Sequence, residues 1–360
     1  MSNLLKDMYN RQSLTKLALD VCAVYSAFDV DKFIESTLDK NWENLELKAR
    51  GRQVCLNLGK YLPEDFDAAI GIIDKIIANH DGFFGTVFND FVEVFGQDEE
   101  NWDISINAME RYTRHASAEF AVRPFIIKHE KRMMAQMLAW SKHEDEHVRR
   151  LASEGCRPAL PWAQSLPAFK KDPTPILPIL EQLKTDLSLY VRKSVANNLN
   201  DISKASPDLV VKIAKEWFGK NECTDWIVKH GCRTLLKKAN REVLEIFGYG
   251  SADSVEVADL ILDVKKCRIG EEIAFSFSIF AKTAAKVRLE YGIDYVKSGG
   301  KRNRKIFKIS EVSLKENERK AYTRKHSFED LSTRKHYPST HSITLIVNGA
   351  EQGTLDFELI

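Results

Sequence analysis

The 360-residue sequence has no uninterrupted apolar run close to the roughly 18 to 20 residues that cross a bilayer. Its first residues, MSNLLKDMYNRQ, also lack the apolar centre of a signal peptide. We therefore expect neither a membrane protein nor a secreted one, and a cytoplasmic location follows.

Cysteine is sparse, and no two cysteines have the C-x-x-C spacing of thiolate zinc sites or redox pairs. This scatter favours isolated thiols in a reducing compartment over disulfides. We therefore expect reduced cysteines and no metal. The six residues concerned are Cys22, Cys55, Cys156, Cys223, Cys232 and Cys267.

The chain has no large excess of either charge, since its formal net charge is +1. The two signs are nevertheless distributed unevenly along it. Residues 1–100 carry 10 Lys and Arg against 18 Asp and Glu, residues 101–250 carry 24 against 18, and residues 251–360 carry 19 against 16. Because phosphate binding depends on local basic patches, the neutral total does not exclude a nucleic-acid partner.

Apolar residues recur at spacings of three and four from about Leu14 to Phe247, which predicts consecutive short helices. Between Ser188 and Ser203, one such stripe faces away from Lys193 and Asn197. This helix should end before Ser206-Pro207, where proline can open the next one. The stripe consists of Val191, Val195, Leu199 and Ile202.

Two tetrapeptides, 147–150 (HVRR) and 190–193 (YVRK), each open a predicted helix and lie 43 residues apart. That spacing falls within the roughly 40 to 47 residues of HEAT-type repeats. A HEAT-like α-helical solenoid stacks its repeats into an extended curved surface, which suits DNA or another protein. A proline-rich insert at 158–178 interrupts the series.

After residue 250 the apolar pattern changes to alternation, as in residues 273–279 (IAFSFSI), where Ile273, Phe275, Phe277 and Ile279 occupy every second position. Together with basic segments near Ile306 and Tyr322, about seven strands are predicted, enough for a small immunoglobulin-like sandwich. The expected chain is mainly α, with a HEAT-like repeat domain at 1–250 and an all-β immunoglobulin-like domain at 251–360. The second domain is also expected to contact DNA.

Residues 143–147 (HEDEH) satisfy the H-E-x-x-H pattern of zinc metalloproteases. Zinc binding needs both histidines on one face of a continuous helix. Here the pentapeptide is expected to join the end of one helix, near Trp140, to the acidic first turn of the next. We therefore reject a metal site.

The segment 297–308 contains six cations and no acid, with a Gly-Gly turn expected to present it on a loop between strands. Arginine in such a loop can enter a DNA minor groove, where the potential is negative. A solvated, mobile loop is an equally good interpretation of the run alone.

Carboxylates on predicted inner helices are candidates for catalysis: Glu119, Glu154 and Asp201. Each has a polar or cationic neighbour three or four residues away. From spacing alone, salt bridges within a helix are the favoured interpretation.

Residues 151–163 (LASEGCRPALPWA) and 190–202 (YVRKSVANNLNDI) resemble the AlkC family of alkylpurine DNA glycosylases, and 226–238 resembles the next repeat of that family. The Glu-Gly-x-Arg-Pro and Asn-Asn-x-x-Asp elements carry the resemblance, which covers most of residues 1–250. The strand-rich C-terminus is similar to the immunoglobulin-like domain that some members have.

The resemblance implies a monofunctional glycosylase that hydrolyses the N-glycosidic bond of alkylated bases, such as N3-methyladenine and N3-methylcytosine, in duplex DNA. It assigns Glu119, Glu154 and Asp201 to a carboxylate cluster that stabilises an oxocarbenium-like sugar, with Asp201 holding the attacking water. Trp162 is expected to contact the lesion. Without the resemblance, Trp162 would be read as a core aromatic that anchors the insert.

The resemblance also implies that the helical face grips and bends DNA instead of enclosing an extruded base. The expected enzyme is a monomer without metal or cofactor, acting on alkylated duplex DNA and associated with the nucleoid if bacterial. A non-catalytic HEAT scaffold that binds DNA or protein is the alternative. The residues expected to bind DNA are Arg123, Arg149, Arg157, Arg192, Lys193, Lys229, Arg233, Lys301, Arg302, Arg304 and Lys305.

Overall fold

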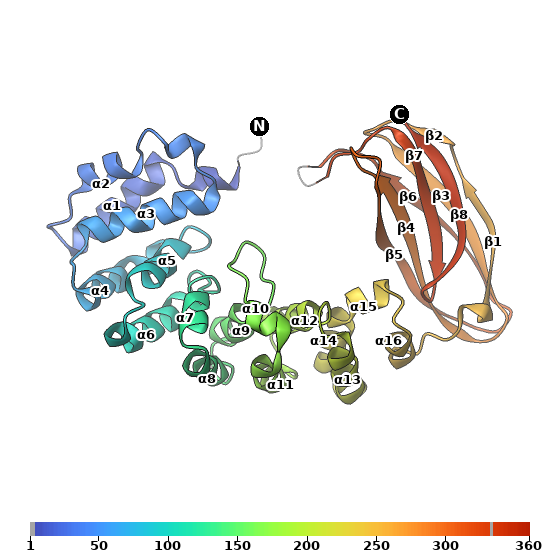
Figure 1. Cartoon of the computed structure of the whole chain (residues 1–360), viewed down its shortest axis with the longest axis horizontal. Helices are drawn as coiled ribbons and strands as arrows, with labels where there is room; N and C mark the ends of the chain where they lie inside the picture. The colour runs from blue at the N-terminus through green and yellow to red at the C-terminus, as the bar shows by residue number, and fades with distance from the viewer. Residues whose placement is uncertain (1–3, 332–333) are drawn as a thin grey trace. The chain divides into compact units, whose positions relative to one another are not determined.

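A computed structural model of the chain describes residues 4–331 and 334–360. The chain forms two compact units, one of Met1–Ala205 with Asn221–Gly231 and one of Ser206–Lys220 with Cys232–Ile360. The regular elements described in the first unit are all helical, whereas the second joins helices to strands (Figure 1). The mainly α fold with a C-terminal β-sandwich is thereby confirmed.

The helices are short, as the apolar periodicity predicts. Those of the first unit are α1 (Arg11–Val24), α2 (Val30–Thr37), α3 (Leu47–Tyr61), α4 (Phe66–Ile76), α5 (Thr86–Phe95), α6 (Trp102–Tyr112), α7 (Val122–Lys128), α8 (Glu130–Trp140), α9 (Glu146–Gly155), α10 (Pro167–Lys171), α11 (Leu177–Leu183), α12 (Leu189–Ile202) and α14 (Glu222–Gly231). Those of the second unit are α13 (Pro207–Trp217), α15 (Arg233–Lys237) and α16 (Arg241–Ile246).

Helix α12 has the expected ends and the expected buried face. Ser188 caps its first turn by accepting a hydrogen bond from the Tyr190 amide, and α13 begins at Pro207. The predicted apolar stripe is 0–2% exposed, and Lys193 lies on the solvent side. Helix α12 packs against both α9 and α14, so burial of this stripe joins successive helices of the row.

The repeat at a spacing of 43 residues is visible in the contacts of Arg149 and Arg192. Arg149 Nη1 donates to the carbonyls of His143 (3.0 Å) and Glu144 (2.6 Å). Arg192 Nη1 donates to the carbonyls of Asp186 (2.9 Å) and Leu187 (2.8 Å). Each arginine thus bonds the residues five and six positions before it, in the turn that leads into its own helix. The arginines of the two tetrapeptides therefore make equivalent hydrogen bonds.

The strands of the second unit form two sheets. Their order is β1-β3-β6 in one sheet and β2-β8-β7-β4-β5 in the other. The described residues form eight strands where about seven were predicted, because the two-residue β2 is too short to show alternation. The strands are β1 (Val255–Leu262), β2 (Lys266–Cys267), β3 (Glu272–Ala281), β4 (Ala285–Val296), β5 (Arg302–Leu314), β6 (Arg319–Ser327), β7 (Ser339–Val347) and β8 (Ala350–Leu359).

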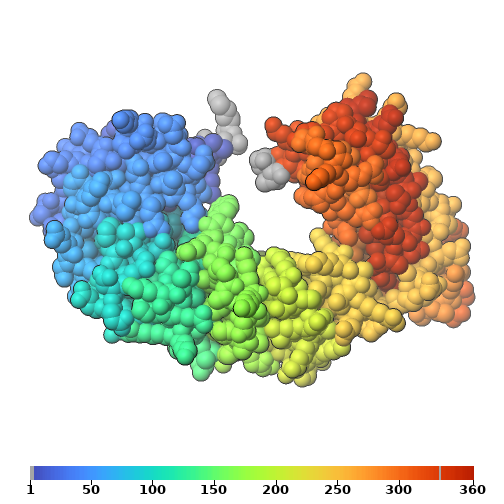
Figure 2. Space-filling model, viewed as in Figure 1, coloured from blue at the N-terminus to red at the C-terminus, as the bar shows by residue number. Residues whose placement is uncertain are grey.

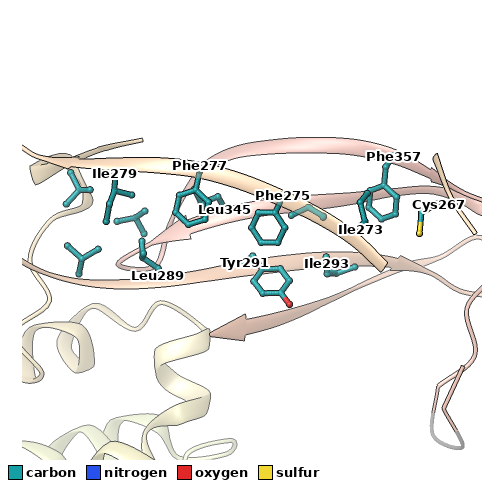
Figure 3. Close-up of a cluster of buried hydrophobic side chains, with 14 of the residues drawn as sticks. Cys267, Ile273, Phe275, Phe277, Ile279, Leu289, Tyr291, Ile293, Leu345 and Phe357 are labelled. Carbon is teal, nitrogen blue, oxygen red and sulfur yellow. The ribbon is translucent and has the colours of Figure 1, made fainter. Parts of the chain in front are cut away.

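The core of the sandwich lies between these sheets (Figure 3). Alternate residues of β3, including Phe275 and Phe277, point inward and meet Tyr291 and Leu289 of β4. The predicted alternation is therefore the buried face of each sheet.

The segment before the first strand is tied to the sandwich. Lys286 Nζ donates to the Phe247 carbonyl (2.8 Å), and Asn348 Nδ2 donates to the Gly250 carbonyl (3.0 Å). The two compact units consequently do not meet at the predicted domain boundary after residue 250, because α13, α15 and α16 belong to the same unit as the strands.

Candidate functional site

The segment between α9 and α10, residues 156–166, projects from the row of helices as a green loop in Figures 1 and 2. It is held from within by Arg123 of α7, whose side chain is fully buried. Arg123 Nη1 donates to the Gly155 carbonyl (2.8 Å), and Nε donates to the Gln164 carbonyl. Burial lowers the pKa of this guanidinium to about 10, which still leaves it charged at neutral pH. Arg123 therefore supports the loop from the interior, and its side chain is not exposed at the surface.

Trp162 stands on this loop with its side chain in solvent. The residue is 67% exposed, so it does not serve as a buried anchor of the insert. Its φ is +63°, in the left-handed region that costs a residue with a side chain roughly 1–2 kcal/mol. The Phe83 ring meets the indole edge-on, with centroids 6.4 Å apart. The strained backbone and the exposed ring point to use of the indole for contact.

The three predicted carboxylates are linked into one chain of ion pairs. Arg150 Nη1 lies 2.5 Å from Glu119 Oε2, and its Nη2 lies 3.5 Å from Glu154 Oε1. Arg157 continues the chain, with Nη1 at 2.7 Å from Glu154 Oε1 and Nε at 2.9 Å from Asp201 Oδ2. The structure therefore brings together carboxylates that are distant in the sequence. Glu119 and Asp201, at the two ends of the chain of ion pairs, are 82 positions apart.

Both ends of this chain have a further partner. Ser117 Oγ donates to Glu119 Oε2 (2.9 Å), and Lys204 Nζ lies 2.9 Å from Asp201 Oδ1. The Glu154 and Asp201 side chains are only 6% and 3% exposed, whereas that of Lys204 is 51% exposed. The bonds to Asp201 thus differ in accessibility, with Arg157 buried and Lys204 at the surface.

The electrostatic balance keeps the bridging arginines charged. Burial alone would lower the pKa of Arg157, but the charges of Glu154 and Asp201 raise it above its ordinary value. Arg150 behaves in the same way, because Glu119 and Glu154 outweigh its burial. Two arginines among three carboxylates leave one negative charge in excess, or none when Lys204 is counted.

A cavity of about 520 Å³ opens beside these residues. Glu119, Glu154, Arg157 and Trp162 line it together, whereas Asp201 lies behind Arg157. The remaining wall includes several rings, which belong to Phe83, Phe120, His115, His147 and Tyr190. Aromatic faces with adjacent carboxylates suit a flat, positively charged ligand.

Spacing did not identify Arg150, Tyr190 or Phe83, which the structure adds to the site. Arg150 lies four residues before Glu154, and its guanidinium stacks over the Tyr190 ring at 4.8 Å. His147 and Tyr190 occupy matching places in the two repeat tetrapeptides, and their rings contact each other at 5.5 Å. The sequence repeat is the signal that relates His147 to Tyr190, but it does not indicate a role for their rings in the site. Phe83 lies on a turn with no motif.

The H-E-x-x-H segment lies at the predicted junction of two helices. Helix α8 ends at Trp140, and α9 begins at Glu146. Asp145 caps α9, since its Oδ1 accepts from the His147 amide at 2.8 Å, and the Asp145 amide donates to His143 Nδ1 at 2.9 Å. His143 therefore lies outside the helix that contains His147, and the two histidines do not share one helix face. This geometry agrees with the prediction that the segment is not a zinc motif.

The cations predicted to bind DNA fall into different environments in the helical unit. Arg149 and Arg192 bond the turns before their own helices, and Arg149 also pairs with Asp186 (2.6 Å). Lys193 is exposed on α12. Lys229 on α14 and Arg233 on α15 are partly buried.

The basic run of the β unit lies mainly on a strand, which corrects the expected loop. Lys297 and Lys301 belong to the turn between β4 and β5, where Gly300 has a φ of +74°. Arg302 bonds Ser342 Oγ (2.9 Å), and Arg304 pairs with Asp294 (2.8 Å). Lys301 and Lys305 are exposed. Residues 302–308 of the run pair in register with β4. Side-chain partners on β4 and β7 therefore hold Arg302 and Arg304 against the sheet.

Comparison with known proteins gives consistent matches. Residues 107–235 match the family model of DNA alkylation repair enzymes, and residues 256–360 match that of the C-terminal Ig-like domain of the uncharacterised protein YhaZ. YhaZ of Bacillus subtilis (strain 168) is 47% identical over 355 residues, which are 99% of this chain and 99% of YhaZ. The alkylpurine DNA glycosylase AlkC of Pseudomonas fluorescens, solved bound to DNA containing an abasic site analog, is 36% identical. That match covers 99% of this chain and 100% of AlkC, with a TM-score of 0.96.

The helical repeats and the family match define a DNA alkylation repair enzyme. Because the similarity to AlkC extends over both units, the chain belongs to the AlkC family of alkylpurine DNA glycosylases. The resemblance seen in the sequence is thus confirmed. Over the described part of the chain, no helix has both the length and the apolar character needed to cross a membrane.

Proposed function

We propose that this protein is a monofunctional glycosylase that hydrolyses the N-glycosidic bond of N3-methyladenine and N3-methylcytosine in duplex DNA. The observation that carries the proposal is the chain of three carboxylates bridged by Arg150 and Arg157, beside a cavity with an exposed Trp162. The AlkC structure of Pseudomonas fluorescens supports the same reaction, since an abasic site is the product that base removal leaves.

The proposed chemistry needs no general acid. A base methylated at N3 already carries a positive charge, so it leaves as a neutral molecule when the bond to the sugar breaks. The protein then has to stabilise positive charge on the sugar and to direct a water molecule to it. Glu119 and Glu154, which face the cavity, are suited to the first task, and the indole of Trp162 to contact with the cationic base.

Asp201 is the proposed holder of the attacking water, although both its oxygens are bonded in the described structure. Oδ2 accepts from Arg157, and Oδ1 pairs with Lys204. We propose that a DNA phosphate draws the half-exposed Lys204 away from Asp201 and frees Oδ1 for the water. The exposed residues Lys193, Lys301 and Lys305 are the other proposed phosphate contacts.

The test is release of free base from dimethyl-sulfate-treated duplex DNA under single-turnover conditions. Asp201→Asn and Glu119→Gln should each slow release by about 10²-fold or more while DNA affinity changes little, as for other electrostatic catalytic groups. Glu130→Gln, which removes an exposed carboxylate of α8, is the matched control and should act like wild type.

Two results would count against the proposal. No release at any enzyme concentration would favour a non-catalytic scaffold, and borohydride trapping of an enzyme–DNA adduct would contradict a monofunctional mechanism. Separate oligonucleotides with one N3-methyladenine or one N3-methylcytosine decide the substrate range.

A further inference from the structure

Lys48 of α3 reaches the loop that carries Trp162, although it lies 114 residues earlier in the chain. Its Nζ donates to the Trp162 carbonyl at 2.9 Å. The same Nζ lies over the Phe120 ring, 4.1 Å from the ring centroid. Trp162 and Phe120 both line the cavity, so one ammonium group contacts two of its walls.

Phe83 approaches the same indole from the turn before α5. Its ring meets Trp162 edge-on, at an interplanar angle of 83°. The position of this turn is set by main-chain contacts with the segment after α6. The Gly82 amide donates to the His115 carbonyl (3.0 Å), and a Cβ on Gly85 would lie 2.3 Å from the His80 carbonyl oxygen. Phe83 is therefore presented by a tightly folded turn.

The Trp162 backbone needs such support because its conformation is unfavourable for a residue with a side chain. Arg123 fixes the loop at Gly155 and Gln164, on either side of Trp162 in the sequence. Lys48 is the side chain that bonds the strained residue itself, at its carbonyl. Loss of this bond leaves the residue free to move toward the more common negative φ, which would turn the indole away from its place.

We propose that Lys48 and Phe83 are positioning residues that hold the Trp162 indole at the cavity, and that the N-terminal helices thereby determine the rate of base release. This inference rests on the proposed glycosylase function. It assigns a role to α3 and to the turn before α5, which precede residues 107–235 of the matched alkylation-repair model.

A simple phosphate contact is the competing explanation for an exposed lysine, and kinetics separates the two. Lys48→Met keeps the aliphatic stem but removes the donor. We expect its single-turnover release of N3-methyladenine from saturating DNA to slow by about tenfold to a hundredfold, the scale of a misplaced catalytic contact. Lys48→Arg, which retains a donor, should recover part of the rate.

The salt dependence of DNA affinity should remain that of wild type in Lys48→Met. Lys60→Met, which removes an exposed lysine bonded only locally to Asn57 on the same helix, is the matched control for rate and affinity. A salt slope smaller by about one with an unchanged rate at saturation would identify Lys48 as a phosphate contact and overturn the proposal.

Action through Trp162 also predicts non-additive effects. In a Trp162→Ala background, Lys48→Met should slow release by less than about twofold, because the group that it positions is already gone. Full multiplication of the two single effects would show that Lys48 acts independently of the indole, and the proposal would be wrong.

A spectroscopic measurement keeps this inference separate from the proposed reaction. The chain has six tryptophans, so 5-fluorotryptophan labelling gives a small set of ¹⁹F resonances, and Trp162→Phe identifies the one from Trp162. Lys48→Met should move that resonance, and Lys60→Met should not. If wild type releases no base yet the resonance moves, the proposed function fails while the positioning holds. An unmoved resonance contradicts the positioning itself.

Discussion

At the scale of single residues, several buried charged and polar side chains are held in connected groups. Arg157 lies between Glu154 and Asp201, so neither carboxylate is left as an isolated charge in the interior. In the sandwich, His326 occupies a comparable central place. Its Nδ1 lies 2.9 Å from the Tyr291 hydroxyl and its Nε2 lies 2.7 Å from the Tyr295 hydroxyl. These groups hold their neighbours in place, and the protonation state of His326 therefore affects folding.

His326 should make the β unit less stable in acid. Burial, followed by the charges of Arg334 and His336, lowers the pKa of His326 from 6.5 to about 4 in the folded chain. As the pH falls from about 6.5 toward 4, the unfolded chain binds a proton that the folded chain does not. The free energy of unfolding should then fall by up to about 3 kcal/mol, whereas above pH 7 this residue contributes no pH dependence.

Urea unfolding at pH 7.5 and pH 4.5 measures this effect when wild type is compared with His326→Gln. The variant should lose less stability between the two pH values, because the other titrating groups are common to both proteins. Equal losses would show that the ring titrates normally in the folded state.

The sequence could identify site residues better than it could identify their surroundings. Glu119, Glu154 and Asp201 follow from family motifs, yet their linkage through Arg150 and Arg157 depends on contacts between residues up to 44 positions apart. Trp162 is exposed and has a positive φ, and no residue pattern predicts that conformation for tryptophan.

At the scale of elements, close approach between helices places the ends of α9 and α12. Ser153 Oγ on α9 donates to Ser194 Oγ on α12 at 2.7 Å, and Asn198 Nδ2 donates back to the Ser153 carbonyl at 2.8 Å. Sequence periodicity predicted the buried face of α12 correctly, because apolar spacing records burial. It could not give the polar contacts between α9 and α12, because small residues such as Ser153 and Gly155 have no periodic signature.

Gly155 and Gly71 form a matched pair for testing this close packing. A Cβ on Gly155 would lie 2.6 Å from Val122 Cγ2 and 2.9 Å from Met137 Cε, whereas one on Gly71 meets nothing within 4 Å. Gly155→Ala should therefore lower the free energy of unfolding by about 1–3 kcal/mol through overpacking. Gly71→Ala, within α4, should raise it by up to about 1 kcal/mol through helix propensity.

Both values are available from urea unfolding followed by circular dichroism at 222 nm. Because Arg123 bonds the Gly155 carbonyl, the packing variant should also loosen the loop that carries Trp162. A Gly155→Ala protein as stable as Gly71→Ala would mean that α7 and α8 can shift to admit a methyl group.

At the scale of the whole molecule, the charge is balanced in total and uneven in distribution, with acidic residues in excess over 1–100 and basic residues beyond. Many of the cations in the basic parts are already paired within the fold. Arg149, Arg192, Arg302 and Arg304 each bond groups of the protein, so a count of basic residues overstates the charge available to DNA. The sequence revealed the basic segments but could not separate paired from available cations, since the partners come from distant strands and turns.

Lys301 and Lys305 are exposed cations of the basic run in the β unit, and they provide the test of its proposed DNA contact. Both are exposed, and partial burial together with the charges of Arg334 and Lys297 lowers the pKa of Lys305, as expected where positive charge gathers without a counterion. If both lysines contact phosphates, the double variant Lys301→Gln/Lys305→Gln should reduce the slope of log affinity against log salt by about two. Its release rate from saturating DNA should remain that of wild type, since neither residue lines the cavity. The control Lys265→Gln/Lys282→Gln removes the same charge from exposed positions elsewhere in the unit. An equal decrease of the salt slope in both double variants would indicate a general effect of charge. An unchanged slope in Lys301→Gln/Lys305→Gln would place DNA away from β5.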